Sequence, residues 1–491
     1  MAGGSAKPED RTVVVSAPGK VLLAGGYIVL DRKHTGLVFG LSARIHVLAQ
    51  EIHTSAGVHL REIVVQSPQF LNATWKYGYH LAENGGGIKV TQLQSSVSPQ
   101  PFRIVALPLT HHRGTPVDPN HFVETTLNYV LSYISQVDKT RAAHGFEPAS
   151  LLVLADNDYY SKPKEPTTTT TTTSRPSSSS STEAPPAPTT TTTSRPRFRH
   201  FHTTLRDAHK TGLGSSAAIV TSLTAALLAH YLPRTLFDLA TPSGRRTLHN
   251  LAQVAHCAAQ GKVGSGFDVA SAVYGSSVYR RFSAGLLAAL PGPGENGFAG
   301  ALVGLVEGDG WDCEVRKEGV GLPQGVAIRM CDVDCGTGTV SMVKKVHAWR
   351  EGNREVAGEV YGKLQGKVDE LAEVLGQGRV EEIGGVMGPF RELMRGMGRA
   401  CGAPIEPDSQ EAMLDALEGV EGVLGSVVPG AGGYDAAAVV MRDDEETEKR
   451  VKAFLREWSK GHEIQVRLMK VKGETEGARM EDPSEFKLWT Q

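Results

Sequence analysis

The chain has few cysteines, no long apolar run and no marked excess of charge of either sign. Its five cysteines form an odd, scattered set, which argues for reduced thiols in a cytoplasmic protein rather than a disulfide framework. No uninterrupted apolar run reaches the ~18 residues of a transmembrane helix, and residues 1–11 lack the apolar core of a signal peptide. The net charge of −2 argues against a general role on nucleic acid or on a membrane surface.

The composition fits a globular protein of more than one domain. The chain has 491 residues, of which 40% are hydrophobic and 21% charged, and this length suffices for two domains with loops. Residues 163–196 consist mainly of Thr and Ser runs with almost no aliphatic side chains. Such a segment cannot bury enough apolar surface to offset its ordering entropy, so we predict that it is a disordered insertion within one domain.

Hydrophobic patterning predicts a mixture of strands and helices. Apolar and β-branched runs predict strands at 12–16, 37–52, 63–66, 151–155, 326–334, 436–441 and 463–471. Helical spacing predicts helices at 121–137, 247–260, 342–375, 379–399, 410–419 and 446–459. We expect the first strand to end in a turn at Ala17-Pro18, and the tail after Gly473 to be frayed.

A glycine-rich stretch, Lys-Thr-Gly-Leu-Gly-Ser-Ser-Ala-Ala at 210–218, opens an apolar run with helical spacing. We expect the helix to begin at Ser215 or Ser216, where unpaired backbone N–H groups form an anion site that a phosphate can approach. The hydroxyl of either serine also suits a phosphate-bound Mg²⁺, which prefers oxygen ligands. A serine-capped helix after a glycine turn explains the same residues, and this stretch alone does not decide between the two.

Two further glycine blocks lie near the ends of the chain. Residues 18–30 read Pro-Gly-Lys-Val-Leu-Leu-Ala-Gly-Gly-Tyr-Ile-Val-Leu, and residues 429–435 read Pro-Gly-Ala-Gly-Gly-Tyr-Asp. In this order, the three blocks resemble the motifs of the galactokinase, homoserine kinase, mevalonate kinase and phosphomevalonate kinase superfamily, over most of the chain. Gly26-Tyr27 and Gly-Ser-Gly-Phe-Asp-Val-Ala-Ser at 264–271 are most similar to the fungal type of phosphomevalonate kinase. Mevalonate and galactose kinases usually carry an acidic residue and a histidine in place of Gly26-Tyr27.

The resemblance implies a two-domain α+β fold with the active site between the domains. The expected N-terminal domain, residues 1–325, resembles ribosomal protein S5 domain 2 and binds ATP, and the expected C-terminal domain, residues 326–491, is ferredoxin-like. The implied reaction is transfer of the γ-phosphoryl group of ATP to 5-phosphomevalonate, with Mg²⁺, in isoprenoid and sterol synthesis. The alternatives are mevalonate kinase or another small-molecule kinase of this superfamily, and a non-catalytic ligand sensor. We expect a monomer or homodimer with no nucleic-acid or membrane partner.

The resemblance also implies roles for individual residues. Lys20 is expected beside the acceptor oxygen, and Asp268 is expected to orient the acceptor or to accept its proton. A phosphate acceptor is already ionised near neutral pH, so we expect Lys20 to matter at least as much as Asp268. The expected ATP-binding residues are Lys210, Gly212, Leu213, Gly214, Ser215, Ser216 and Ala217, with Ser216 also on Mg²⁺. The expected substrate-binding residues are Tyr27, Ser265, Thr339, Ser341, Lys344, Lys345, Gly430, Ala431, Gly432 and Gly433.

One position departs from the mevalonate kinases, which carry a metal-binding glutamate eleven residues before the catalytic aspartate. Counting back from Asp268 gives Cys257, so the carboxylate ligand is absent at this position. Either Mg²⁺ relies on Ser216, phosphates and water, or another residue supplies a ligand. The sequence leaves both arrangements open.

Overall fold

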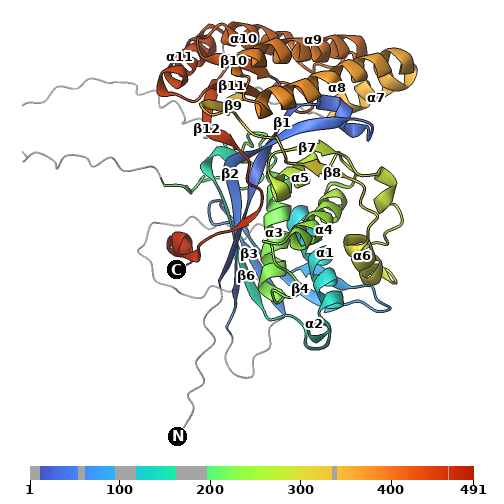
Figure 1. Cartoon of the computed structure of the whole chain (residues 1–491). Helices are drawn as coiled ribbons and strands as arrows, with labels where there is room; N and C mark the ends of the chain where they lie inside the picture. Colours follow the sequence, from blue (N-terminus) through green and yellow to red (C-terminus); the bar gives the residue numbers. More distant parts are fainter. Residues whose placement is uncertain are drawn as a thin grey trace, which may run out of the picture.

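The computed structural model describes residues 12–53, 61–93, 118–161, 196–333, 340–462 and 464–490. In these ranges the strands form one 13-stranded sheet, and helices pack against it in two groups (Figure 1). The predicted α+β class is confirmed. Except for Pro196, the predicted insertion at 163–196 lies outside the described residues.

Most of the predicted elements are present, with ends that differ by a few residues. The strands are β1 (Val13–Ala24), β2 (Thr35–Glu51), β3 (Glu62–Gln66), β4 (Thr74–Leu81), β5 (Ile88–Gln92), β6 (Ala149–Ala155), β7 (Ser277–Arg280), β8 (Glu314–Arg316), β9 (Val326–Val333), β10 (Val423–Val427), β11 (Ala436–Arg442), β12 (Val466–Glu474) and β13 (Arg479–Met480). The α-helices are α1 (His121–Val137), α2 (Lys139–His144), α3 (Ser215–Tyr231), α4 (Pro242–Gln260), α5 (Phe267–Tyr274), α6 (Phe298–Glu307), α7 (Val340–Gly352), α8 (Arg354–Gly376), α9 (Ile383–Cys401), α10 (Asp408–Glu418) and α11 (Glu445–His462). The patterning did not predict strands β4, β5, β7, β8, β10 and β13 or helices α2 and α6.

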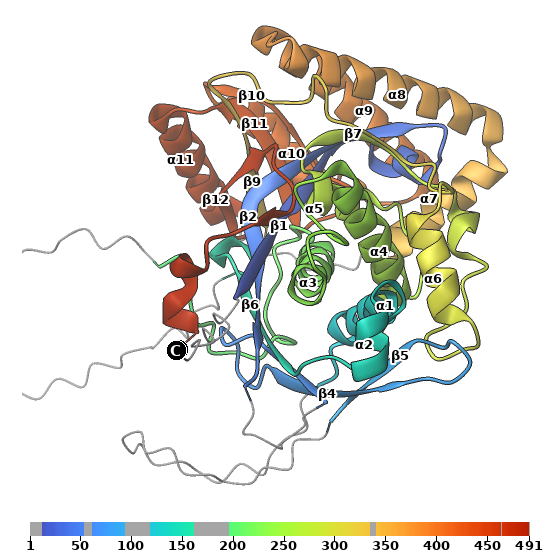
Figure 2. The same ribbon diagram turned by 60° about the horizontal axis from the view of Figure 1, so that its bottom comes forward.

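The long strand β2 connects the two halves of the molecule. It pairs with β1, β6 and β7 in the first half, and Leu41 of β2 pairs with Gly473 of β12 in the second half. In the second half, antiparallel strands follow the order β10-β11-β9-β12, which fits the expected ferredoxin-like arrangement. Helices α7 to α10 lie with these strands, whereas α1, α3, α4 and α5 cover one face of the first half (Figure 2). The division of domains at residues 325 and 326 stays a prediction.

Helix α3 is the central helix of the first half. Almost every side chain after its first turn is buried, including Val220, Leu223 and Leu227. A helix that is apolar all round belongs inside a protein, because it has no face to present to water. Helix α3 packs against β1, α1, α4 and α5, so its N-terminus is held rigidly within the first half.

Strand β1 does not end at Ala17-Pro18, so the prediction of a turn there is wrong. The strand continues to Ala24, and its register against β2 shifts between Pro18 and Gly19. Proline cannot donate to a strand ladder and is tolerated where a bulge interrupts the pairing. Because of the bulge, β1 stays paired with β2 both before and after Pro18, and Lys20 lies in the paired part of the strand.

The C-terminal tail is ordered, so the prediction of fraying after Gly473 is also wrong. Strand β13 pairs with β1, and the following 3₁₀ helix (Pro483–Trp489) places Phe486 in a cluster with Val14 and Leu48. In Figure 1 this red segment lies on the face of the sheet opposite to α3 and α4. Val14 and Leu48 stand more than four hundred residues before Phe486, so periodicity within the tail itself could not reveal them.

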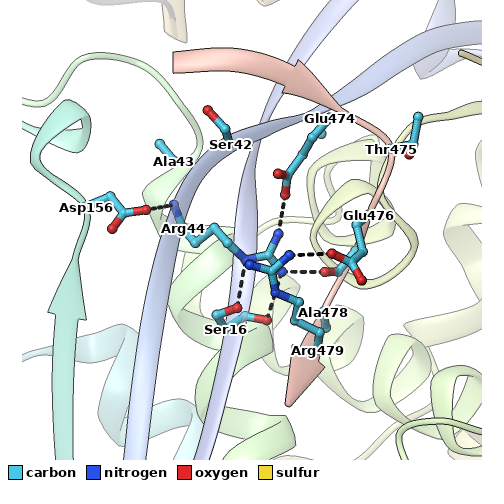
Figure 3. Close-up of polar contacts among 12 residues, drawn as sticks. Ser16, Ser42, Ala43, Arg44, Asp156, Glu474, Thr475, Glu476, Ala478 and Arg479 are labelled. Carbon is cyan, nitrogen blue, oxygen red and sulfur yellow. Dashed lines mark hydrogen bonds and ion pairs between the residues drawn. The ribbon is translucent and has the colours of Figure 1, made fainter. Parts of the chain in front are cut away.

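An ion cluster around Arg44 fixes the start of this tail (Figure 3). The Arg44 side chain is 1% exposed; its Nε donates to Ser16 Oγ at 2.7 Å, and its terminal nitrogens contact Glu474 and the Gly477 carbonyl. Arg479 Nε donates to Glu481 Oε1 at 3.0 Å beside it. Breaking a buried charge pair leaves an unpaired charge, so each partner holds the other in place.

Candidate active site

The start of α3 is an open helix end built from backbone groups. Gly214 occupies the N-cap with φ of 81° and provides no side-chain cap, so the alternative of a serine-capped helix is wrong. The first helical bond runs from Ala218 N–H to Gly214 O at 3.3 Å. The N–H groups of Ser215, Ser216 and Ala217 consequently lack intrahelical partners and are available to an anion.

Gly214 is required there for two reasons. The left-handed conformation is costly for residues with a Cβ, and a Cβ at this position would lie 2.9 Å from Lys20 Cε and from Lys20 Cγ. The side chain of Lys20 thus lies directly against the backbone of the loop. This close approach explains the glycine at position 214, whereas Gly212 is favoured by its φ of 73° alone, since a Cβ there would meet no atom within 4 Å.

Lys20 is anchored to the glycine loop by its main chain and by its side chain. Its N–H donates to Leu213 O at 2.9 Å, and its Nζ donates to Gly212 O at 3.1 Å. Burial lowers the pKa of Lys20, and the negative charge of Asp268 opposes that lowering. The ammonium group lies 6.0 Å from the centre of the Phe267 ring at the start of α5, so it stands between two helix N-termini.

The start of α5 repeats the construction of α3 and carries Asp268 in its first turn. Gly266 is the N-cap with φ of 85°, and a Cβ there would lie 2.6 Å from Tyr279 Oη. The same tyrosine hydroxyl donates to Ser265 O at 3.1 Å, which holds the preceding loop. Asp268 Oδ1 accepts from Val269 N–H at 3.0 Å, and 22% of its side chain is exposed. Asp268 can therefore meet a bound molecule.

His256, which the sequence did not single out, lies between two of the predicted residues. Its Nε2 is 3.2 Å from Ser216 Oγ and 3.8 Å from Asp268 Oδ2. The neighbouring Cys257 is buried, accepts from Gln253 Nε2 at 3.3 Å, and has a thiol pKa that burial raises. A protonated thiol is a poor ligand for Mg²⁺. The signal that could have found His256 is its position one residue before Cys257 on the same helix.

The third glycine block is bound to the first one. The buried Tyr27 donates from its hydroxyl to Ala431 O at 2.6 Å, and Gly430 N–H donates to Leu22 O at 3.2 Å. Gly433 N–H donates to Ile405 O at 2.9 Å and Gly432 N–H to Pro429 O at 3.2 Å. The structure thus brings Tyr27 and the third block together, with several backbone donors already used within the protein.

The remaining predicted residues lie before α3, on α7 or outside the described residues. Lys210 forms an isolated bridge with Tyr160. Lys344 and Lys345 are exposed on α7, and Lys345 Nζ donates to Gly402 O at 2.8 Å. Thr339 lies outside the described residues, and Ser341 belongs to α7.

The donor set fits a cation that is already bound to phosphate. The described residues contain no group of three or more His, Cys, Asp or Glu side chains that could hold a metal unaided. They do offer the hydroxyl of Ser216 beside an open helix end. The Asp268 carboxylate lies in the same region, because His256 Nε2 is 3.2 Å from Ser216 Oγ and 3.8 Å from Asp268 Oδ2. Mg²⁺ commonly takes one or two protein oxygens, with phosphates and water as the remaining ligands.

Comparisons with known proteins agree with this geometry. Residues 199–276 match the family described as GHMP kinases N terminal domain. The chain is 53% identical over 479 residues to a phosphomevalonate kinase of Gibberella zeae, covering 97% of this chain and 98% of that protein. It is 39% identical to a phosphomevalonate kinase of Aspergillus fumigatus, with 97% and 98% covered. The phosphomevalonate kinase of Streptococcus pneumoniae, solved with phosphomevalonate and AMPPNP, shares the fold at a TM-score of 0.57 and 15% identity, covering 94% of this chain and 100% of that chain.

Proposed function

Because the chain belongs to the phosphomevalonate kinase family, we propose that it transfers the γ-phosphoryl group of ATP to (R)-5-phosphomevalonate. The products are 5-diphosphomevalonate and ADP, a step of the mevalonate pathway of isoprenoid and sterol synthesis. The observation that carries the proposal is the position of Lys20, whose Nζ is bonded to Gly212 O at the open end of α3. Asp268 lies at the second open helix end beside it.

The start of α3 binds the phosphates of ATP in this proposal. The unpaired N–H groups of Ser215, Ser216 and Ala217 act as donors, and the helix dipole favours negative charge at the same point. Gly212, Leu213 and Gly214 shape the loop, and Lys210 adds positive charge at its edge. The Ser216 hydroxyl is the protein ligand for Mg²⁺, which neutralises charge on the phosphates when bound.

Lys20 and Asp268 act at the transferred group. Phosphoryl transfer depends mainly on positioning and on stabilising charge, and a lysine held by two carbonyl contacts is preorganised for that task. Asp268 orients the acceptor. Little proton abstraction is asked of Asp268, because a phosphate monoester is largely ionised near neutral pH.

The acceptor is held between the first and third blocks. We assign this role to Tyr27, Ser265, Thr339, Ser341, Lys344, Lys345 and residues 430–433. Tyr27 and Ala431 act as a pair, since their hydrogen bond joins the two blocks. The lysines of α7 supply charge for the phosphate of the acceptor.

We further propose a cytoplasmic enzyme that acts on small molecules, as a monomer or homodimer, without a nucleic-acid or membrane partner. None of the described helices has both the length and the apolar character needed to cross a bilayer. The net charge of −2 gives no electrostatic reason to bind nucleic acid.

The test is a coupled ADP-release assay with phosphomevalonate, mevalonate, galactose and homoserine as acceptors. We expect ADP release with phosphomevalonate and little with the other three. Preference for mevalonate would move the chain to another reaction within the superfamily, and no acceptor-dependent turnover would favour a ligand sensor.

A further inference from the structure

A buried histidine links the two functional helix ends. His256 lies four residues before the last residue of α4, Gln260, and is 2% exposed. Its Nε2 faces Ser216 Oγ at 3.2 Å and Asp268 Oδ2 at 3.8 Å. Only the first of these distances is a hydrogen bond, so the imidazole is bonded to the serine and merely near the aspartate.

The neighbours of the imidazole define which nitrogen carries the proton. The side-chain nitrogen of Gln260 lies 3.0 Å from the same His256 Nε2. With the Gln260 amide nitrogen as the donor, Nε2 is the acceptor and its lone pair is free of a proton. The single lone pair of Nε2 then faces two donors, the Gln260 amide at 3.0 Å and the Ser216 hydroxyl at 3.2 Å, and is shared between them.

That bond determines the direction of the serine oxygen. A hydroxyl has one proton and two lone pairs; when the proton points to His256 Nε2, the lone pairs of Ser216 Oγ point elsewhere. A cation ligand needs those lone pairs, and a hydroxyl free to rotate would present its proton to the cation for part of the time. Outer partners of metal ligands commonly fix orientation in this manner.

We propose that His256 is a positioning residue that holds the hydroxyl proton of Ser216 and directs its oxygen lone pairs to a phosphate-bound Mg²⁺. The inference rests on the proposed role of Ser216. His256 touches neither ATP nor the acceptor in this assignment; it acts through Ser216.

Helix α4 provides a matched control. His249 lies on the same helix, is 1% exposed, and bonds through Nδ1 to Asn250 Oδ1 at 3.1 Å. Its ring packs against Tyr274 and Trp311, away from Ser216. A purely structural effect of replacing a buried histidine should therefore appear at both positions, whereas an effect on the cation should appear at His256 alone.

The experiment compares His256→Leu, His256→Gln and His249→Leu. Leucine fills the space of the ring but accepts no hydrogen bond, whereas the carbonyl oxygen of glutamine can accept a hydrogen bond from the Ser216 hydroxyl. Calorimetry measures the affinity for ATP with excess Mg²⁺ and with a chelator. The ratio of these two affinities is the gain in ATP affinity that Mg²⁺ provides. We expect His256→Leu to reduce this gain about tenfold, with unchanged metal-free ATP affinity. His256→Gln should restore most of the gain, and His249→Leu should keep all of it.

Several outcomes would overturn the inference. One is an equal Mg²⁺-dependent gain in His256→Leu and the wild type, and another is the same loss in His249→Leu. If His256→Leu does not fold, His256→Asn replaces it, because its shorter amide does not reach Ser216, and it should lose the gain that His256→Gln retains. A wild type that binds MgATP but transfers nothing to phosphomevalonate would contradict the proposed function while leaving this binding test intact.

Discussion

The glycine blocks around Lys20 and the C-terminal tail are held in different ways. In the blocks, side chains bond to main-chain carbonyls: Lys20 to Gly212 O and Tyr27 to Ala431 O. In the tail, side-chain packing and ion pairs add to the main-chain pairing of β13 with β1: Phe486 is fully buried and Glu474 is paired with Arg44. In the proposed function the first construction positions charge for chemistry, and the second closes the far face of the sheet. We therefore expect mutations in the two regions to separate rate from stability.

The largest expected effect is on the tail. Phe486→Ala removes a fully buried ring and should lower the free energy of unfolding by about 3–5 kcal/mol, the range for deleting a large buried side chain. Because the ring packs on the face of the sheet opposite to α3, kcat at a permissive temperature should stay near the wild-type value. Urea denaturation and steady-state kinetics on the same preparation check both parts.

Leu488→Ala is the matched control for that experiment. Leu488 lies in the same 3₁₀ helix but is 89% exposed, so its loss should change the free energy of unfolding by less than about 0.5 kcal/mol. Equal destabilisation by the two substitutions would mean that the tail does not pack on the sheet as described.

The second-largest expected effect is a fall in the turnover rate, kcat. Lys20→Met removes the ammonium group while keeping an apolar stem of similar length, and it should lower kcat on the order of 10²-fold, the scale for losing one preorganised charge. The free energy of unfolding should not fall, because burial already disfavours the charged form. If only KM rose while kcat stayed intact, Lys20 would be a binding residue rather than a catalytic one.

Asp268→Asn should have a smaller effect on kcat than Lys20→Met. The amide keeps the shape and one acceptor oxygen, and an ionised phosphate acceptor needs little base catalysis. A loss of about 10²–10⁴-fold, as expected for a general base acting on an alcohol, would instead indicate a hydroxyl acceptor. Steady-state kinetics with circular dichroism to confirm folding distinguishes the two.

The smallest expected effect is at the contact between the blocks. Tyr27→Phe removes the hydrogen bond to Ala431 O and should lower the free energy of unfolding by about 0.5–1.5 kcal/mol. It should also raise KM for the acceptor, since the third block is then held less firmly to the first. Denaturation curves and acceptor titrations measure the two changes, and an unchanged KM would show that the contact is structural only.

The difference between the glycine blocks and the C-terminal tail also explains which features the sequence could predict. The glycine loop was identifiable, because binding phosphate at a helix end requires specific residue types at fixed spacing. The roles of Lys20 and Asp268 were expected from the resemblance to the kinase superfamily, and they stay a prediction. The tail was not identifiable, since β13 and Phe486 meet partners such as Val14 that are remote in the chain. One local sign existed: β1 is apolar on both faces, which predicts that both faces of the sheet are covered. His256 was missed because a buried histidine on a helix resembles an ordinary core residue, as His249 on the same helix does.

The central claim is that the three blocks form one site that phosphorylates a phosphate group. Phosphorus-31 NMR of the product, after removal of nucleotides, tests it most directly. Incubation with ATP, Mg²⁺ and phosphomevalonate should give a pair of mutually coupled signals from two linked phosphates. Two uncoupled phosphomonoester signals from one product would mean transfer to a hydroxyl, and inorganic phosphate beside unchanged phosphomevalonate would mean hydrolysis of ATP; either result would contradict the account.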